Sequence, residues 1–281
     1  MNILHISDLH FGPRHWDGYD DILIDKINSL DADVVINTGD NTSDGLECEC
    51  SDAGEFLKAI KCNHVISTIG NHDKRNMRSH EFFRKYIYNP EIISIPEETK
   101  TSKRHLFLDR ETTKINEYFT DINFIESITL NGKTYLIISI DSTELYNDDG
   151  YVENKVLEAV SKKIKKTQFD IPLLITHYSI LGTDECPLKN SGCLIDFVQE
   201  HKIEYVFCGH THELELMKTN DLYKGSIFSQ YMCGSLSSRN HPNDDNMFLY
   251  YTNVGMADMH LYLIRIFHDG DQTSFQEEMV F

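Results

Sequence analysis

Five short clusters of carboxylate, imidazole and amide side chains follow apolar runs in this sequence. The densest is Gly70-Asn71-His72-Asp73, which follows an apolar run typical of a buried strand. The other four, in chain order, are Asp8-Leu9-His10, Gly39-Asp40-Asn41, Thr176-His177 and Gly209-His210-Thr211-His212. Oxygen and imidazole donors without Cys suit divalent ions such as manganese, iron or zinc, and they do not suit a structural zinc. The clusters therefore predict a catalytic metal centre.

Histidines and cysteines outside these clusters have simpler explanations. A histidine on an apolar strand is more often hydrogen-bonded in the core than bound to a metal, and we assign His5, His64 and His201 to that class. Cys48 and Cys50 form a C-x-C in an acidic loop, but no second cysteine pair or histidine stands at zinc-site spacing. These residues are left out of the predicted centre.

Alternating strands and helices must position the clusters in the first part of the chain. Apolar runs at 2–7, 34–37 and 64–69 predict strands, and apolar periodicity at 22–30 and 52–61 predicts helices between them. This β-α-β pattern implies right-handed crossovers and a largely parallel sheet. Ligands of such sheets bind at the carboxyl ends of the strands, so the clusters are expected to meet there.

The second half of the chain is expected to contribute antiparallel strands. Asn131-Gly132 between two apolar runs predicts a type I′ hairpin of residues 124–130 and 134–140. Helices are predicted at 152–166 and 193–201, and strands at 172–175, 205–208, 227–233, 247–251, 260–267 and 273–281. We expect a mostly antiparallel sheet from this half, packed on the first, which gives an α/β (α+β) fold.

Length and charge limit the domain count and the partners. With 281 residues, of which 40% are hydrophobic, the chain can bury one large core, so we predict a single domain over 1–281. Within it, 74–121 is an irregular insertion with a short helix at 79–86, and it is a candidate cap over the site. The net charge of −19 disfavours non-specific binding to nucleic acid or acidic membranes. A phosphate ligand would need a local positive charge, which bound metal ions would provide.

The predicted location is the cytoplasm. The N-terminus shows neither a basic segment nor an apolar stretch long enough for a signal peptide or a membrane span. The seven cysteines are odd in number and scattered, which favours reduced thiols over a disulfide framework. The sequence does not predict the oligomeric state.

The clusters in their order, D-x-H, G-D, G-N-H-D, H and G-H-x-H, resemble the calcineurin-like metallophosphoesterase superfamily. The resemblance covers the chain from Ile3 to about His212, and it is the combination of motifs that is specific. The opening Leu4 to Gly12 and the segment 209–212 are most similar to the cyclic-nucleotide-phosphodiesterase-like branch. The resemblance implies a mixed β-sandwich of two sheets, flanked by helices, and a hydrolase that uses two divalent metal ions, manganese, iron or zinc.

The resemblance also implies a role for each motif residue. One metal ion would be bound by Asp8, His10, Asp40 and His212, and the second by Asp40, Asn71, His177 and His210. Asp40 would bridge the two ions, and a hydroxide between them would attack phosphorus. His72 would be the general acid beside the leaving group, and Asp73 would orient His72 and help to charge it.

The second motif departs from the usual family pattern. Many members have G-D-x-x-[DN], whereas Asp40 here is followed by Asn41, Thr42 and Ser43, with Asp44 one position later. Either Asn41 or Asp44 could support the site, and we predict neither as a metal ligand. The bridging role expected of Asp40 is unaffected.

The leading functional hypothesis is hydrolysis of a phosphodiester, with a small or cyclic nucleotide as the first candidate. A phosphomonoesterase acting on a protein or a metabolite is the rival, because the same metals serve both reactions. A nuclease is disfavoured by the acidic charge, and an inactive scaffold of the same fold is the alternative from another class. Candidate substrate contacts are Arg14, His15, Trp16, Lys74, Arg75, Arg239, Asn240 and His241, although a solvated loop is the commoner explanation for any one of them.

Overall fold

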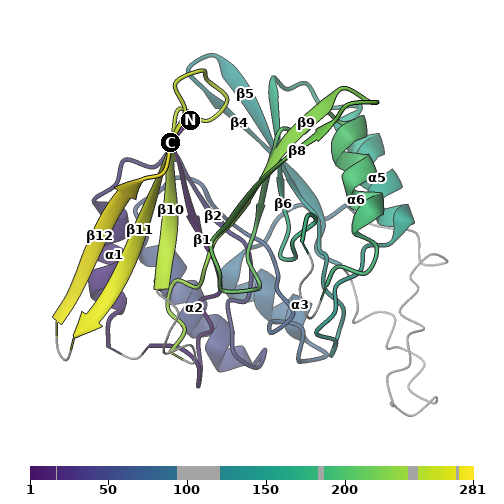
Figure 1. Ribbon diagram of the computed structural model, residues 1–281. Helices are drawn as coiled ribbons and strands as arrows, with labels where there is room; N and C mark the ends of the chain where they lie inside the picture. The colour runs from purple at the N-terminus through teal and green to yellow at the C-terminus, as the bar shows by residue number, and fades with distance from the viewer. Residues whose placement is uncertain (17, 94–120, 183–186, 240–245, 270–271) are drawn as a thin grey trace, which may run out of the picture.

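Two six-stranded sheets face each other in this protein, with helices on their outer sides (Figure 1). The structure, a computed structural model, describes residues 1–16, 18–93, 121–182, 187–239, 246–269 and 272–281. The first sheet has the order β12-β11-β10-β1-β2-β3 and the second β4-β5-β6-β7-β9-β8. Both sheets contain parallel and antiparallel pairs, so the predicted α/β (α+β) class with two mixed sheets is confirmed.

The first sheet is built around three parallel strands. Its members are β1 (Ile3–Ile6), β2 (Val34–Asn37), β3 (Val65–Ser67), β10 (Asn246–Thr252), β11 (His260–Asp269) and β12 (Gln272–Met279). β1 and β3 each pair in parallel with β2, which confirms the β-α-β pattern. Helices α1 (Asp20–Asn28) and α2 (Glu47–Ala59) pack their apolar side chains on the outer face of this sheet. α2 begins five residues before the prediction, because the Glu49 carboxylate accepts hydrogen bonds from backbone N–H groups at its start.

The second sheet has the predicted hairpin at one edge. Its members are β4 (Phe124–Leu130), β5 (Lys133–Ser139), β6 (Ile171–Ile175), β7 (Tyr205–Cys208), β8 (Glu215–Asp221) and β9 (Ser226–Met232). Asn131 and Gly132 have φ values of 51° and 78°, as a type I′ turn requires. Helices α5 (Asn154–Ile164) and α6 (Ser191–Glu200) cover the outer face.

The expected antiparallel sheet from the second half is wrong in two respects. β5, β6, β7 and β9 pair in parallel, and β10 leaves this half to pair with β1 in the first sheet. Alternation along a strand identifies the strand, but it does not identify the partner. β8 was not predicted, because it is a partly exposed edge strand without a regular apolar face.

The main core lies between the two sheets, where the inner faces of both contribute apolar side chains. Short helix α3 (Ser79–Phe82) continues into a π-helical turn, η1 (Phe83–Ile87), close to the predicted helix at 79–86. Phe83 anchors this segment in the core between the sheets. Most of the predicted cap, 94–120, lies outside the described residues. Within the described residues, no helix combines the length and the apolar character needed to cross a membrane.

Candidate metal centre

All five clusters lie immediately beyond the carboxyl ends of strands that have parallel neighbours. Asp8 and His10 follow β1, Asp40 follows β2, and Asn71 follows β3. In the second sheet, His177 follows β6, and the pair His210 and His212 follows β7. The two sheets face each other, so one site can receive ligands from both of them.

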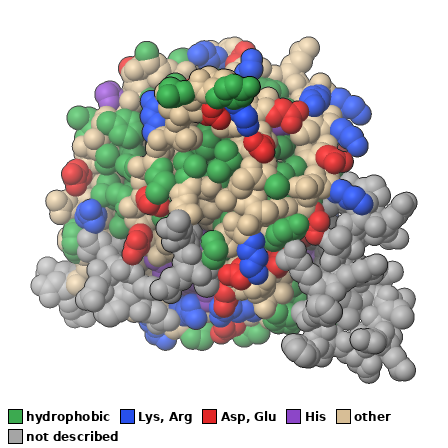
Figure 2. Space-filling model, turned by 45° about the vertical axis from the view of Figure 1, so that its right-hand side comes forward, with side chains coloured by type: hydrophobic (Ala, Val, Ile, Leu, Met, Phe, Trp, Pro, Cys, Tyr) green, Lys and Arg blue, Asp and Glu red, His purple; other side chains and the backbone are tan. Residues whose placement is uncertain are grey.

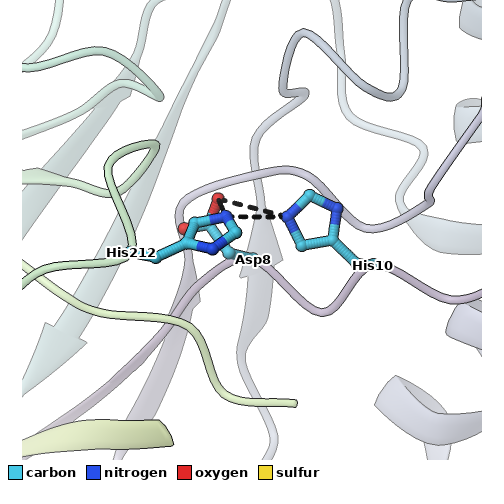
Figure 3. A group of neighbouring side chains, drawn as sticks. All are labelled: Asp8, His10 and His212. Carbon is cyan, nitrogen blue, oxygen red and sulfur yellow. Dashed lines mark hydrogen bonds and ion pairs between the residues drawn. The ribbon is translucent and has the colours of Figure 1, made fainter. Parts of the chain in front are cut away.

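Three side chains from the two sheets form the first group, shown in Figure 3. His10 Nε2 is 2.9 Å from His212 Nε2, and Asp8 Oδ1 is 3.4 Å from His212 Nε2 and 3.9 Å from His10 Nε2. Donor atoms bound to one ion at about 2.1 Å lie about 3 to 4 Å apart, depending on the angle between them. These three donors therefore have the spacing of ligands around a single cation.

A second group lies next to the first, and Asp40 lies between the two. His177 Nε2 is 2.9 Å from Asn71 Oδ1 and 3.5 Å from Asp40 Oδ1. The other carboxylate oxygen, Oδ2 of Asp40, is 3.8 Å from His10 Nε2. The two oxygens of Asp40 thus face different groups, as a bridging carboxylate would.

His210 has a less direct place in the second group. Its imidazole ring centroid is 5.1 Å from that of His177 and 4.2 Å from that of Tyr178. Its backbone N–H donates a hydrogen bond of 3.1 Å to Asp8 Oδ2. The structure therefore brings all seven predicted ligands into one region. His210 lies beside His177, with which it is predicted to bind the second ion.

The backbone at the ligands adopts a conformation that most residues avoid. Five of the predicted ligands have positive φ: Asp8 (54°), His10 (50°), Asp40 (51°), His210 (83°) and His212 (62°). A positive φ costs free energy in residues other than glycine, and such strain concentrates at functional sites. The surrounding sheets must hold these residues in place.

Three glycines of the motifs lie where neighbouring atoms are too close to leave room for a Cβ atom. A Cβ atom at Gly70 would collide with the Asp40 carboxylate, and one at Gly209 would collide with Ser7. At Gly39, φ is 107° and a Cβ atom would lie 2.8 Å from His177 Nδ1. The glycines before Asp40, Asn71 and His210 therefore let the neighbouring strands and loops approach the centre.

The charges buried at this site favour a bound cation. Burial raises the pKa of Asp40 well above its usual value, and the nearby carboxylates of Asp8 and Asp73 raise it further. Burial lowers the pKa of His10 and His177, so both imidazoles are neutral and can act as ligands. Within the described residues, the buried atoms Asp8 Oδ1 and His10 Nδ1 have no hydrogen-bond partner. Crowded carboxylates, neutral imidazoles and an unpartnered carboxylate oxygen together fit a divalent metal ion.

His72 lies beside the predicted ligands, with its ring centroid 4.8 Å from that of His10. Nδ1 of His72 is 2.6 Å from the Ser43 carbonyl oxygen, which can only accept, so Nδ1 is protonated and donates. Nε2 then accepts hydrogen bonds from Arg14 Nη1 at 3.1 Å and Arg75 Nη2 at 3.2 Å. Burial, together with the smaller effect of the two arginines, lowers the pKa of His72 to about 3. His72 is therefore neutral in this arrangement.

The carboxylate of Asp73 accepts hydrogen bonds from neighbouring loops and none from the His72 side chain. Its buried carboxylate accepts hydrogen bonds from the backbone N–H of Gly70 and from both backbone and side-chain donors of Asn41 and Thr42. The Ser43 carbonyl oxygen is the hydrogen-bond partner of the His72 ring, so an effect of Asp73 on His72 would be transmitted through these loops. Asn41 thus supports the site through Asp73.

Only two of the substrate-contact candidates face His72 in the described residues, and these are Arg14 and Arg75. The Lys74 ammonium is buried 2.6 Å from Asp141, so it is paired in the interior. The remaining described candidates are also placed: His15 is buried and bonds Asp20 and the Leu9 carbonyl, Trp16 packs on His268, and the backbone N–H of Arg239 donates to the Arg14 carbonyl. Asn240 and His241 lie outside the described residues.

Sequence reasoning missed the groups that orient the ligands. The Asn71 side-chain NH₂ donates to Asp148 Oδ1 at 3.3 Å, which turns the Asn71 oxygen toward His177. His177 Nδ1 donates to the Thr38 carbonyl oxygen at 2.9 Å, which leaves Nε2 free to bind a metal. Asp148 lies in an acidic turn far along the chain, and a backbone carbonyl has no signal in a motif of side chains.

Replacing Asp148 with alanine is expected to lower kcat/KM by about 10–100-fold, the usual cost of losing a group that orients a metal ligand. The Asn71 amide would lose the acceptor that fixes its rotation, and Arg75 would lose a carboxylate 3.2 Å away. Hydrolysis of bis-p-nitrophenyl phosphate over a manganese titration measures the change. Asp149→Ala is the control, because Asp149 pairs with Lys189 instead. Equal activities in the two variants would contradict the role of Asp148.

Comparisons with known proteins agree with this geometry. A family model described as calcineurin-like phosphoesterase matches residues 1–214. A probable cyclic nucleotide phosphodiesterase of Xenorhabdus bovienii (strain SS-2004) is 22% identical over 240 residues, which are 79% of this chain and 83% of that protein.

Solved structures resemble the fold at low sequence identity. The purple acid phosphatase PPD1 from yellow lupin (Lupinus luteus) seeds has a TM-score of 0.55 and 11% identity, covering 99% of this chain and 53% of that chain. The NAD nucleotidase NadN of Haemophilus influenzae has a TM-score of 0.52 and 14% identity, covering 98% of this chain and 49% of that chain. At these identities the matches show the fold alone.

The matched segment 1–214 is most of the chain, and it contains all five clusters. The predicted resemblance and the predicted metallophosphoesterase-like architecture are thereby confirmed. The chain belongs to the calcineurin-like phosphoesterase family and is a metal-dependent phosphoric ester hydrolase.

Proposed function

We propose that this protein hydrolyses a phosphodiester of a small nucleotide, using two divalent metal ions bound by the seven predicted ligands. The observation that supports it best is the position of Asp40, whose two oxygens face two separate groups of donors. The similarity to a probable cyclic nucleotide phosphodiesterase supports the diester and the nucleotide. Asp8, His10, Asp40 and His212 would bind one ion, and Asp40, Asn71, His177 and His210 the other.

The chain's own residues would organise the reaction around this centre. Bound ions would supply Lewis acidity to the phosphoryl oxygens and lower the pKa of the attacking water. Asp148 and the Thr38 carbonyl would fix the orientations of Asn71 and His177, so that little reorganisation is needed during the reaction. Asp73 would hold the loops that present Asp40 and His72.

His72 is the proposed general acid for the leaving oxygen. In the free protein, two guanidinium groups donate to its Nε2, and burial together with these two charges keeps the ring neutral. A bound phosphate would offer these arginines better acceptors and would place negative charge next to the ring. Both changes raise the pKa of His72, because a like charge is neutralised and an opposite charge is added. Substrate binding would therefore prepare His72 to carry a proton.

The surface supports a small substrate over a nucleic acid. Lys and Arg side chains are scattered among Asp and Glu on the face in Figure 2, and the described residues there form no basic stripe. With a net charge of −19, the protein repels a polyanion at long range. A phosphomonoester is the second candidate, because the two arginines beside His72 could neutralise its additional charge.

Metal removal and reloading test this proposal. The protein is stripped with EDTA, reloaded with manganese and assayed with bis-p-nitrophenyl phosphate, p-nitrophenyl phosphate and cyclic AMP, while bound metal is counted by mass spectrometry. We expect two ions per chain, loss of activity on chelation, recovery on reloading and preference for diesters. Two bound ions without hydrolysis of any substrate would favour the scaffold, and a single ion would contradict the dinuclear centre.

A further inference from the structure

Two guanidinium groups converge on one nitrogen atom beside the candidate metal centre. Arg14 Nη1 is 3.1 Å and Arg75 Nη2 is 3.2 Å from His72 Nε2. The two arginines come from different loops, one after β1 and one after β3. A neutral imidazole nitrogen has one lone pair, so it cannot satisfy two donors well. Two positive charges therefore lie close together, and the single acceptor atom between them is shared by both.

The two arginines differ in how their charges are balanced. Arg75 lies 3.2 Å from Asp148 Oδ1 and 3.6 Å from Asp44 Oδ1, so two carboxylates brace it. In the described part of the chain, the Arg14 guanidinium has no carboxylate within 4.0 Å. The Arg14 side chain is also partly buried, so water compensates its charge incompletely. The positive charge of Arg14 is thus not balanced by a carboxylate of the described residues, and it could bind an anion.

A phosphate is the anion that fits this pair best. Its oxygens accept several hydrogen bonds at once, and arginine binds them through two parallel donors. A phosphate between Arg14 and Arg75 would replace the single lone pair of His72 as their acceptor. In an acidic protein, such a local cationic pair selects the substrate by charge.

Building on the proposed function, we propose that Arg14, with Arg75 as its braced partner, binds a second phosphate of the substrate, one that is not hydrolysed. This phosphate lies on the side of His72, which is the proposed side of the leaving group. The substrate class is then a phosphodiester that bears an additional phosphate, such as a 5′-phosphorylated dinucleotide. A singly charged cyclic mononucleotide would leave Arg14 without its anion.

A matched pair of substrates tests this inference on the manganese-loaded full chain. Adenylyl-3′,5′-adenosine and its 5′-phosphorylated form have the same scissile diester and differ in one terminal phosphate. We expect the wild type to prefer the phosphorylated form. Arg14→Ala should lower kcat/KM for that form by about 10–100-fold more than for the unphosphorylated form, mainly through KM, so that the preference of the wild type is lost. Arg14→Lys should fall between them, because lysine keeps the charge without the two parallel donors.

Arg84→Ala is the control, since it removes one positive charge from an exposed arginine that bonds Asn89. The proposal is overturned if the wild type does not discriminate between the dinucleotides, or if Arg14→Ala weakens both equally. A loss confined to p-nitrophenyl phosphate would also overturn it, because that result assigns the extra charge to the scissile phosphate.

Binding separates this inference from the proposed function. If the wild type hydrolyses none of these substrates, the proposed function fails, and calorimetric binding of the two dinucleotides then decides about Arg14. Tighter binding of the phosphorylated form that disappears in Arg14→Ala supports the inference, and equal binding overturns it. Thermal unfolding shows which variants fold, and Arg14→Lys takes the place of Arg14→Ala if the alanine variant does not.

Discussion

Asp40→Asn is expected to lower phosphodiester hydrolysis by about a thousand-fold or more. A bound metal ion stabilises the transition state by several kcal/mol, and each 1.4 kcal/mol is a factor of about ten in rate. The asparagine keeps the size of the side chain and can still accept the hydrogen bond of 2.8 Å from the His72 backbone N–H. It removes the charge and one of the two oxygens that face the two ligand groups. Both metal affinities should therefore fall together.

The same substitution is expected to stabilise the metal-free protein near neutral pH. Burial, Asp8 and Asp73 raise the pKa of Asp40 in the folded state, so the folded state binds a proton more tightly than the unfolded chain does. The contribution of Asp40 to stability is therefore present below its unfolded pKa of about 4, and it is lost as the pH rises toward the raised value. Asparagine avoids this loss, and the difference from the wild type should shrink at acidic pH.

Thermal unfolding with and without manganese measures both effects. The metal-free Asp40→Asn protein should have a Tm above that of the metal-free wild type at pH 7–8, whereas manganese should raise the Tm of the wild type alone. Asp52→Asn, on the exposed side of α2, is the control for removing one negative charge. A variant that binds two metal ions with normal activity would rule out the bridging position of Asp40.

The predicted ligands could be found from the sequence because they follow strands. A residue just beyond a parallel strand lies at the carboxyl edge of its sheet, whatever the rest of the fold does. This rule alone predicts that Asp8, Asp40 and Asn71 lie beside one another. It does not place the last three strands, because β10 pairs with β1 through contacts between residues far apart in the chain.

The groups that orient the ligands could not be predicted from the sequence, for a different physical reason. The carbonyls of Ser43 and Thr38 act through the backbone, so any side chain could stand at those positions. Asp148 acts from a turn between β5 and α5, and its contact with Asn71 depends on how the two sheets face each other. The contacts of Lys74 and Asp73 could not be predicted, because position next to a motif says nothing about the direction of a side chain. The structure shows both carboxylate and ammonium turned into buried contacts.

Asp73→Ala is expected to destabilise the protein and disrupt its metal centre together. The Asp73 carboxylate accepts five hydrogen bonds, from Gly70, Asn41 and Thr42, at distances from 2.8 to 3.2 Å. A buried donor left without an acceptor costs about 1–3 kcal/mol, and losses within one network add incompletely, so we expect a loss of about 3–5 kcal/mol in the free energy of unfolding. That corresponds to a fall in Tm of about 10 °C for a chain of this size.

His72→Asn separates this structural role of Asp73 from a catalytic one. If Asp73 holds the loops, Asp73→Ala loses Tm, manganese affinity and kcat at once, because Asp40 and Asn71 lie in the loops that it joins. His72→Asn should then lose kcat while it keeps both the Tm and the manganese affinity of the wild type. Denaturant unfolding, a manganese titration and a pH–rate profile of each variant make the comparison. A different result would contradict this structural role: Asp73→Ala keeps normal stability and metal binding and changes only the pH–rate profile. Asp73 would then act on the proton of His72, and its hydrogen bonds to the loops would not be required for activity.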